Sequence, residues 1–324
     1  MNIIDRKFNS HMEFVGQFDE EELYVAMLNL YRDYLSGKNN VSPQTVNNII
    51  SYHNKFPFWG SGDFSNPDNF LANRAHMLTA HKDEIRAVYE LLDDYRSKAV
   101  YSAVIGSLIN FAAAINDLDN AAEKAFEEYF DLDLFSIKDR EVFVDCGAYD
   151  GKNCCEYYKY FDGEDPDRFM FYAYEITKEQ IPVIKENLRG NGIKHFSVRQ
   201  KAVSDNNGEL VLSSNDDASA NTVSSGQGGE VMVKAVRIDD DITEPITFLK
   251  MDIEGAEQAA IRGAARHIRD DKPKLGISIY HSYEDMWKIP LMIDEICPGY
   301  RFRLQSKSGN LVPTEIMLLC SHGR

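Results

Sequence analysis

The run VFVDCGAYDG, from Val142 to Gly151, places an acidic side chain and two glycines directly after an apolar stretch. A strand that ends near Asp145 and turns through Gly147 and Gly151 into a helix lets the backbone approach a ligand closely. The start of such a helix favours carboxylate or phosphate groups, and Asp145 accepts hydrogen bonds from an amino group or water. The spacing differs from the G-x-G-x-x-G of dinucleotide sites, and glycines that serve turn geometry alone are the alternative.

A second acidic side chain, Glu175, ends the apolar run FMFYAYE, 24 positions beyond Gly151. An acid at the tip of the second strand can bind both ribose hydroxyls of an adenosine-containing cofactor. A solvated glutamate at a strand end is the alternative. Together with the glycine run, the position of Glu175 favours the ribose role.

The run ITFLKMDIEGAE brings Lys250, Asp252 and Glu254 to the end of another apolar strand. Alternation predicts that these three side chains share one side, where open α/β sheets bind ligands. Glu254 and Glu257, three apart at a predicted helix start, suit its dipole, and helix capping is their alternative interpretation. Lys250 needs a partner, because an unpaired charge inside an apolar strand is unfavourable.

His281 follows the run LGISIY, so the sequence places an imidazole at the same predicted sheet edge. A histidine titrates near neutral pH, which suits proton transfer. A structural role is the alternative for a single histidine.

The elements that must position these side chains form an alternating strand and helix pattern from Glu141 onward. This pattern predicts a mostly parallel sheet with helices on both faces. The predicted parallel strands are 142–146, 169–174, 195–199, 246–251 and 275–280, and the predicted helices are 151–161, 181–188, 254–268 and 285–297. Runs 300–304 and 315–319 predict an antiparallel edge pair, and runs 209–213 and 231–238 an inserted hairpin.

Residues 1–134 show apolar positions at helical spacing and predict an all-helical N-terminal domain, with residues 135–324 forming the second domain. Leu23, Met27 and Tyr31 mark one helix face, and the pairs 42–43 and 66–67 each put a capping residue before a proline at a predicted helix start. No catalytic constellation stands out in this part of the sequence.

The totals restrict the class of protein. The 324 residues carry a formal net charge of −17, which argues against nucleic acid or an anionic membrane as the main partner. No apolar run reaches the roughly 18–20 residues of a membrane span, and the first residues lack a signal-peptide pattern. Five cysteines without framework spacing suit reduced thiols, so we expect a cytoplasmic protein.

In chain order, several runs resemble the FkbM family of S-adenosylmethionine-dependent methyltransferases. The matching runs over about residues 125–320 are VDCGAYDG, AYE, KAVSDNNGE, RIDD, FLKMDIEGAE, IRGA and KPKLGISIYH. The runs YHSYEDMWKIP and PTEIMLLC resemble members associated with polysaccharide and other sugar-linked pathways.

This resemblance implies a class I methyltransferase fold, in which seven strands include one antiparallel strand, and O-methylation of a saccharide or secondary metabolite. It implies a cofactor loop of Asp145, Gly147, Ala148, Tyr149 and Gly151, with Glu175 at the ribose. The adenine is expected against Ala202 and Val203. Asp252 matches the acid of the fourth strand, whereas Lys250, Glu254 and His281 match positions whose roles we infer.

The expected reaction is displacement of the sulfonium methyl by a substrate hydroxyl, with His281 or Asp252 as the base and Lys250 steadying charge. Mg²⁺ held by Asp252 and Glu254 against sugar hydroxyls is an alternative. Two other classes remain open: a non-catalytic binding or scaffolding protein that keeps the fold, and an NAD-dependent oxidoreductase. The second is disfavoured by the absent G-x-G-x-x-G.

Overall fold

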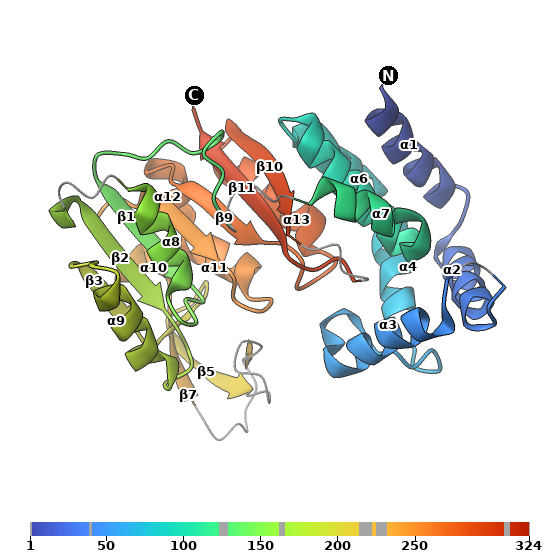
Figure 1. Cartoon of the computed structure of the whole chain (residues 1–324), viewed down its shortest axis with the longest axis horizontal. Coiled ribbons are helices and arrows are strands. Elements are labelled where there is room, and N and C mark those ends of the chain that lie inside the picture. Colours follow the sequence, from blue (N-terminus) through green and yellow to red (C-terminus); the bar gives the residue numbers. More distant parts are fainter. Residues whose placement is uncertain are drawn as a thin grey trace. The chain divides into compact units, whose positions relative to one another are not determined.

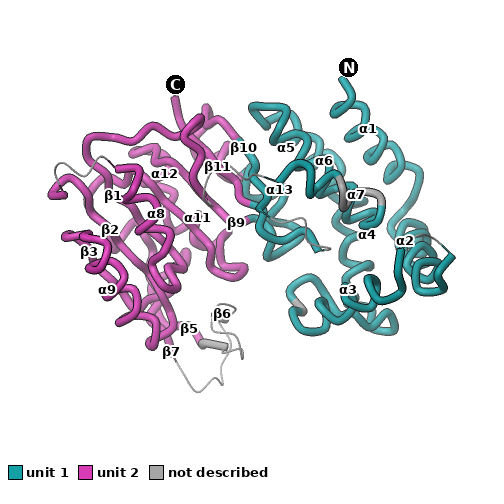
Figure 2. The backbone as a smooth tube through the Cα atoms, viewed as in Figure 1, with its two compact units in different colours: residues 1–124, 279–291, 303–316 teal, residues 125–278, 292–302, 317–324 magenta. Residues whose placement is uncertain are grey.

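The computed structural model of the chain describes residues 2–38, 41–122, 129–161, 166–213, 222–224, 232–307 and 312–323. Figure 1 shows its helices and strands, and Figure 2 its two compact units. One unit comprises Met1–Lys124, Ile279–Leu291 and Arg303–Ile316, and is called the helical unit below. The other comprises Ala125–Ser278, Met292–Phe302 and Met317–Arg324, and is called the sheet unit.

A seven-stranded sheet confirms the predicted α/β class. Its strand order is β10-β11-β9-β8-β1-β2-β3. The strands are β1 (Glu141–Cys146), β2 (Phe169–Tyr174), β3 (Phe196–Arg199), β8 (Phe248–Met251), β9 (Lys274–Ser278), β10 (Tyr300–Ser306) and β11 (Ile316–His322). The first five run parallel to one another, and β11 runs antiparallel to β9. The predicted edge pair therefore forms one end of the sheet.

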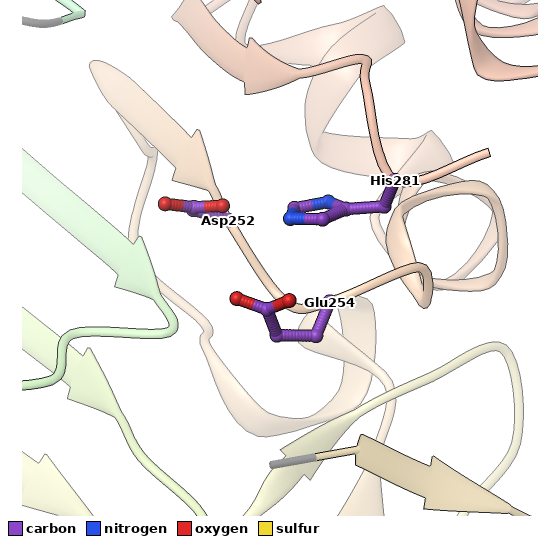
Figure 3. Close-up of side chains that lie close together, drawn as sticks. All are labelled: Asp252, Glu254 and His281. Carbon is purple, nitrogen blue, oxygen red and sulfur yellow. The ribbon is translucent and has the colours of Figure 1, made fainter. Parts of the chain in front are cut away.

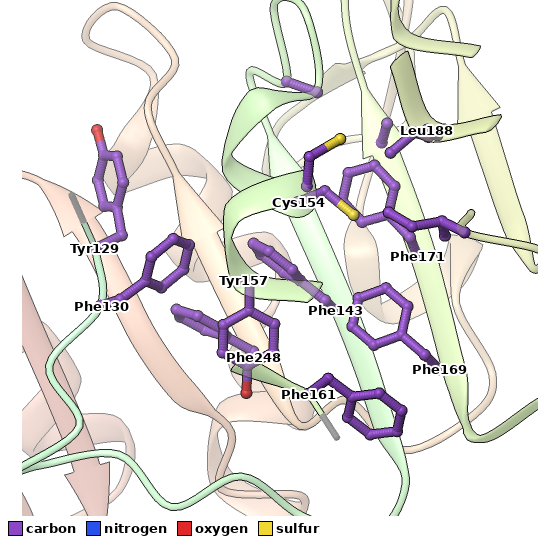
Figure 4. Close-up of a cluster of buried hydrophobic side chains, with 14 of the residues drawn as sticks. Tyr129, Phe130, Phe143, Cys154, Tyr157, Phe161, Phe169, Phe171, Leu188 and Phe248 are labelled. Atoms are coloured by element: carbon purple, nitrogen blue, oxygen red, sulfur yellow. The ribbon is translucent and has the colours of Figure 1, made fainter. Parts of the chain in front are cut away.

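Helices α8 (Lys152–Tyr160) and α9 (Gln180–Gly190) cover one face of this sheet (Figure 1). Figure 4 shows the aromatic core between them and the strands, where Phe143 stacks on Phe248 with ring centroids 4.7 Å apart. Burying a side chain of this size contributes roughly 1.5–3 kcal/mol. This packing fixes β1, β2 and β8 against one another, so their carboxyl ends are held at a common edge.

The segment after β8 differs from the prediction of one helix over 254–268. The structure has α11 (Glu257–Gly263) and α12 (Ala265–Asp270), preceded by a tight turn. The buried carboxylate of Glu257 accepts hydrogen bonds from the backbone N–H of Ile253 at 2.8 Å and of Gly255 at 3.0 Å. Strand β8 ends at Met251, and Glu254 lies beyond it with φ +55. The strand alternation predicted for Glu254 therefore does not reach this residue.

A second sheet contains the predicted insertion. It has the order β4-β7-β5-β6, with β4 (Ala202–Val203), β5 (Gly208–Ser213), β6 (Thr222–Ser224) and β7 (Met232–Val236). Strands β5 and β7 pair antiparallel, as predicted for a hairpin. Most of the Ser/Asn/Gly-rich loop predicted between them lies outside the described residues.

The N-terminal part is helical, as predicted. Its elements are α1 (Ile3–Val15), α2 (Glu20–Leu35), α3 (Pro43–Lys55), η1 (Pro57–Trp59), α4 (Phe70–Ala80), α5 (Lys82–Leu91), α6 (Tyr95–Ile109) and α7 (Phe111–Ala121). Ser42 caps α3 as predicted. The helix start predicted at Asn66–Pro67 is wrong, because the Asn66 side chain accepts from Asp68 N in a local turn. Asn69 caps α4 instead.

The remaining described elements are the 3-10 helix η2 (Pro166–Arg168) and the helices α10 (Ile238–Asp241) and α13 (Asp285–Ile296). All five cysteines fall within the described residues, and each is a buried free thiol. Among the described helices, none has both the length and the hydropathy that a membrane crossing requires.

Candidate active site

The loop between β1 and α8 contains both predicted glycines. Gly147 has φ +79 and Gly151 φ +77, a region that residues with a side chain rarely adopt. A Cβ atom at position 147 would lie 1.8 Å from the backbone oxygen of Asp252. Gly147 therefore allows the loop after β1 to lie directly against the segment after β8, which brings two predicted parts of the site together.

Glu175 joins the end of β2 to this same loop. One carboxylate oxygen accepts a hydrogen bond from Tyr149 N at 2.9 Å, and the other accepts from Thr177 N at 2.7 Å. The Glu175 side chain is buried, whereas Tyr149 is exposed and has φ +47. Glu175, which the sequence predicts at the end of a strand, therefore also fixes the conformation of the glycine loop.

Lys250 finds its partner in Asp145 on the neighbouring strand. The two residues are register partners in β8 and β1, with Lys250 Nζ 2.9 Å from an Asp145 carboxylate oxygen. Their side chains are 2% and 0% exposed. Lys250 Nζ also donates to Gly147 O at 2.8 Å. The ammonium therefore joins the buried acid to the glycine loop.

Burial governs the charges of this pair. It raises the pKa of the Asp145 carboxyl to about 6, and attraction to Lys250 opposes the rise. Burial also disfavours the ammonium of Lys250, but attraction to Asp145 and Asp252 outweighs it and raises its pKa. Lys250 is consequently a fixed positive charge beneath the site.

Asp252, directly after β8, is held by a residue that the sequence did not single out. Tyr129 Oη donates to a carboxylate oxygen of Asp252 at 2.9 Å and lies 2.8 Å from Ser278 Oγ at the end of β9. An added Cβ at Gly276 would lie 3.1 Å from the Tyr129 Cβ, so this glycine admits the close approach. No motif marks Tyr129, which contacts Asp252 across 123 positions of sequence.

His281 follows the end of β9 by three residues, and β8 and β9 are neighbouring parallel strands. Figure 3 shows its imidazole with the carboxylates of Asp252 and Glu254, and one ligand atom from each of the three lies within 4.8 Å of the others. Two carboxylates and one imidazole suit proton transfer or a divalent cation.

The remaining predicted positions lie near the ends of β2 and β3. Ala148 is buried and its N–H donates to Tyr174 O at 3.1 Å. Ala202 and Val203 are buried in β4, three residues beyond β3. The roles of these residues in holding an adenosine group stay predictions.

The sheet order, with five parallel strands and β11 inserted antiparallel beside β9, defines a class I methyltransferase fold. Residues 145–304 match the family model described as the methyltransferase FkbM domain. This match confirms the family resemblance that the sequence runs predicted.

One solved structure supports the fold. The crystal structure of methyltransferase FkbM from Methylobacillus flagellatus aligns with a TM-score of 0.62 and 23% identity, over 76% of this chain. The chain spans 61% of the length of that protein. A putative methyltransferase from Streptococcus mutans, solved with S-adenosylhomocysteine, aligns over 56% of this chain and 88% of its own, with a TM-score of 0.36 and 10% identity. No curated protein matches.

Proposed function

We propose that this chain transfers a methyl group from S-adenosylmethionine to a hydroxyl oxygen of a small acceptor, a saccharide or a secondary metabolite. The observation that carries the proposal is the bond between Glu175 and the glycine loop, 2.9 Å from carboxylate oxygen to Tyr149 N, at the carboxyl ends of two parallel strands. Open α/β sheets bind their ligands at this edge. The high negative charge of the chain favours an acceptor other than nucleic acid.

The hydrogen-bond acceptors of Glu175 suit an adenosine cofactor. Each carboxylate oxygen of Glu175 accepts one backbone N–H and keeps a second lone pair for a ribose hydroxyl. Ala202 and Val203 offer buried apolar surface to a purine. When bound, S-adenosylmethionine supplies an electrophilic methyl group on its sulfonium.

The residues at the ends of β8 and β9 bind the acceptor and remove its proton. A sugar hydroxyl is a poor nucleophile at neutral pH, so a base must take its proton during transfer, and His281 is the proposed base. Asp252, oriented by Tyr129, orients the imidazole or the hydroxyl. Glu254 binds a second acceptor hydroxyl, and Lys250 holds Asp145 and steadies developing negative charge through the buried network.

Metal assistance is the second candidate mechanism. Asp252 and Glu254 offer hard oxygen ligands close to His281, which suits Mg²⁺ held against vicinal hydroxyls. Chelation separates the two mechanisms, because a base-only enzyme keeps its rate in the presence of a chelator.

The proposed reaction is tested by incubating the full chain with methyl-labelled S-adenosylmethionine and a panel of free sugars, nucleotide sugars and aliphatic or phenolic alcohols. We expect S-adenosylhomocysteine release that depends on the acceptor, with the label on an oxygen of the product. Label on nitrogen or carbon of the acceptor contradicts the proposed O-methylation while keeping the methyltransferase class.

Replacing Glu175 with alanine should weaken binding of S-adenosylhomocysteine by on the order of 1.5–3 kcal/mol, because charge-assisted hydrogen bonds to two hydroxyls are lost. Calorimetric titration measures the dissociation constant. Glu244→Ala is the matched control, because it removes a carboxylate that accepts a hydrogen bond from Tyr172 Oη in β2, the strand that Glu175 follows. An unchanged constant for Glu175→Ala removes this residue from the ribose site.

A further inference from the structure

The segment that carries His281 has no regular secondary structure. It runs from the end of β9 at Ser278 to the start of α13 at Asp285. Such a segment holds one conformation only where other groups fix its backbone. Within the helical unit, to which residues 279–291 belong, the N-terminal helices supply these groups.

Trp59 fixes the peptide group next to His281. Its indole Nε1–H donates to the backbone oxygen of Tyr280 at 2.7 Å, across 221 positions of sequence. This oxygen belongs to the peptide that joins Tyr280 to His281, so the bond restricts rotation of that peptide plane. Trp59 is itself buried, and its own backbone oxygen accepts from Asn73 Nδ2 at 3.2 Å.

Arg74 fixes the chain on the other side of His281. Its Nε–H donates to Tyr283 Oη at 2.8 Å, and another guanidinium nitrogen lies 3.4 Å from Tyr31 Oη. Arg74 is 1% exposed, so loss of an acceptor would leave a buried charged donor unsatisfied. Arg74 belongs to α4, and its guanidinium lies 4.9 Å from the centre of the Phe70 ring of the same helix.

Further contacts hold the start of α13. Tyr101 Oη of α6 donates to Met286 O at 3.4 Å. The His81 and Trp287 rings stack with centroids 4.1 Å apart. Four residues from different parts of the N-terminal region thus converge on residues 280–287.

We propose that Trp59 and Arg74 are positioning residues, and that the N-terminal helices set the place of His281. The inference rests on the proposed function, in which His281 takes the acceptor proton. It gives the helical region a part in the reaction, because the same hydrogen bonds that order residues 279–284 determine where the imidazole lies.

The test uses the full chain labelled with ¹³C at histidine Cε1, with the His281 resonance assigned by its loss in His281→Gln. Trp59→Phe removes the indole donor and keeps an aromatic ring, and Tyr283→Phe removes the acceptor of Arg74. Both variants should shift or broaden the His281 resonance. Both should speed amide exchange within residues 281–284 roughly fivefold or more, as expected for one lost hydrogen bond. Affinity for S-adenosylhomocysteine should stay within about twofold, because Glu175 and the glycine loop are intact.

Trp287→Phe is the matched control, because it removes an indole whose N–H makes no hydrogen bond to the described residues and keeps an aromatic ring for the stack on His81. It should leave the His281 resonance unchanged. An unaltered resonance and exchange in Trp59→Phe and Tyr283→Phe, or equal changes in Trp287→Phe, overturn the positioning role. Absence of S-adenosylhomocysteine binding by the unmodified chain would instead refute the proposed function, so the two failures are distinguishable.

Discussion

Replacing Lys250 with methionine should destabilise the chain by roughly 3–5 kcal/mol, because it leaves the carboxylate of Asp145 buried without its counter-charge. Asp145 is 0% exposed, and burial already raises its pKa to about 6 in the presence of Lys250. Without the ammonium its pKa should rise further. Urea unfolding measured at pH 8 gives the size of the loss.

The dependence on pH follows from the same acid. The folded-state pKa of Asp145, about 6, exceeds its unfolded value of 3.8. Its contribution to stability is therefore greatest below pH 3.8 and decreases as the pH rises through about 6. In Lys250→Met this decrease should be larger and extend to higher pH, so the variant should regain part of its stability at pH 5.

Two controls make the result specific. Asp145→Asn combined with Lys250→Met should recover much of the loss, because no buried charge remains. Lys234→Met, at an exposed position of strand β7, should change stability by less than about 0.5 kcal/mol. A Lys250→Met variant as stable as the unmodified chain at pH 8 contradicts the buried ion pair.

Replacing His281 with alanine should reduce turnover by roughly 10²–10⁴, once an acceptor is identified, and leave the affinity for S-adenosylhomocysteine unchanged. The imidazole accepts the acceptor proton only when it is neutral, so the rate of the unmodified enzyme should fall at low pH. Steady-state rates across pH 5 to 9, with calorimetry at pH 7.5, measure both effects.

A metal mechanism gives the opposite pattern. Chelation would then abolish turnover, added Mg²⁺ would restore it, and Asp252→Asn would be the more damaging change. His195→Ala serves as the control, because that histidine is exposed and bonds Asp167. A chelator-sensitive enzyme with a nearly normal His281→Ala variant refutes the base and favours the metal.

Local patterns predicted the sheet because each parallel strand is a short apolar run, and three of the five are followed by a glycine or an acid. The run around Gly147 was predictable for this reason, since a positive φ and a close approach both require glycine. The predicted helix over 254–268 begins too early in the sequence. Nothing in the local sequence shows that the Glu257 carboxylate accepts hydrogen bonds from the N–H groups of Ile253 and Gly255.

Contacts distant in sequence were beyond prediction. Tyr129 reaches Asp252 across 123 positions, and Trp59 reaches Tyr280 across 221. Neither residue lies in a motif, and tyrosine and tryptophan in apolar surroundings are ordinary core residues. The sequence therefore predicted candidate groups at the carboxyl ends of the strands, whereas the residues that orient these groups required the structure.

In the proposed function, Glu175 and the glycine loop hold S-adenosylmethionine. Calorimetric titration of the full chain with S-adenosylhomocysteine, and separately with NAD, tests it most directly. We expect saturable binding of S-adenosylhomocysteine that Glu175→Ala weakens, with no heat from NAD. Saturable binding of NAD, with none of S-adenosylhomocysteine, would contradict the proposed cofactor and the proposed methyl transfer.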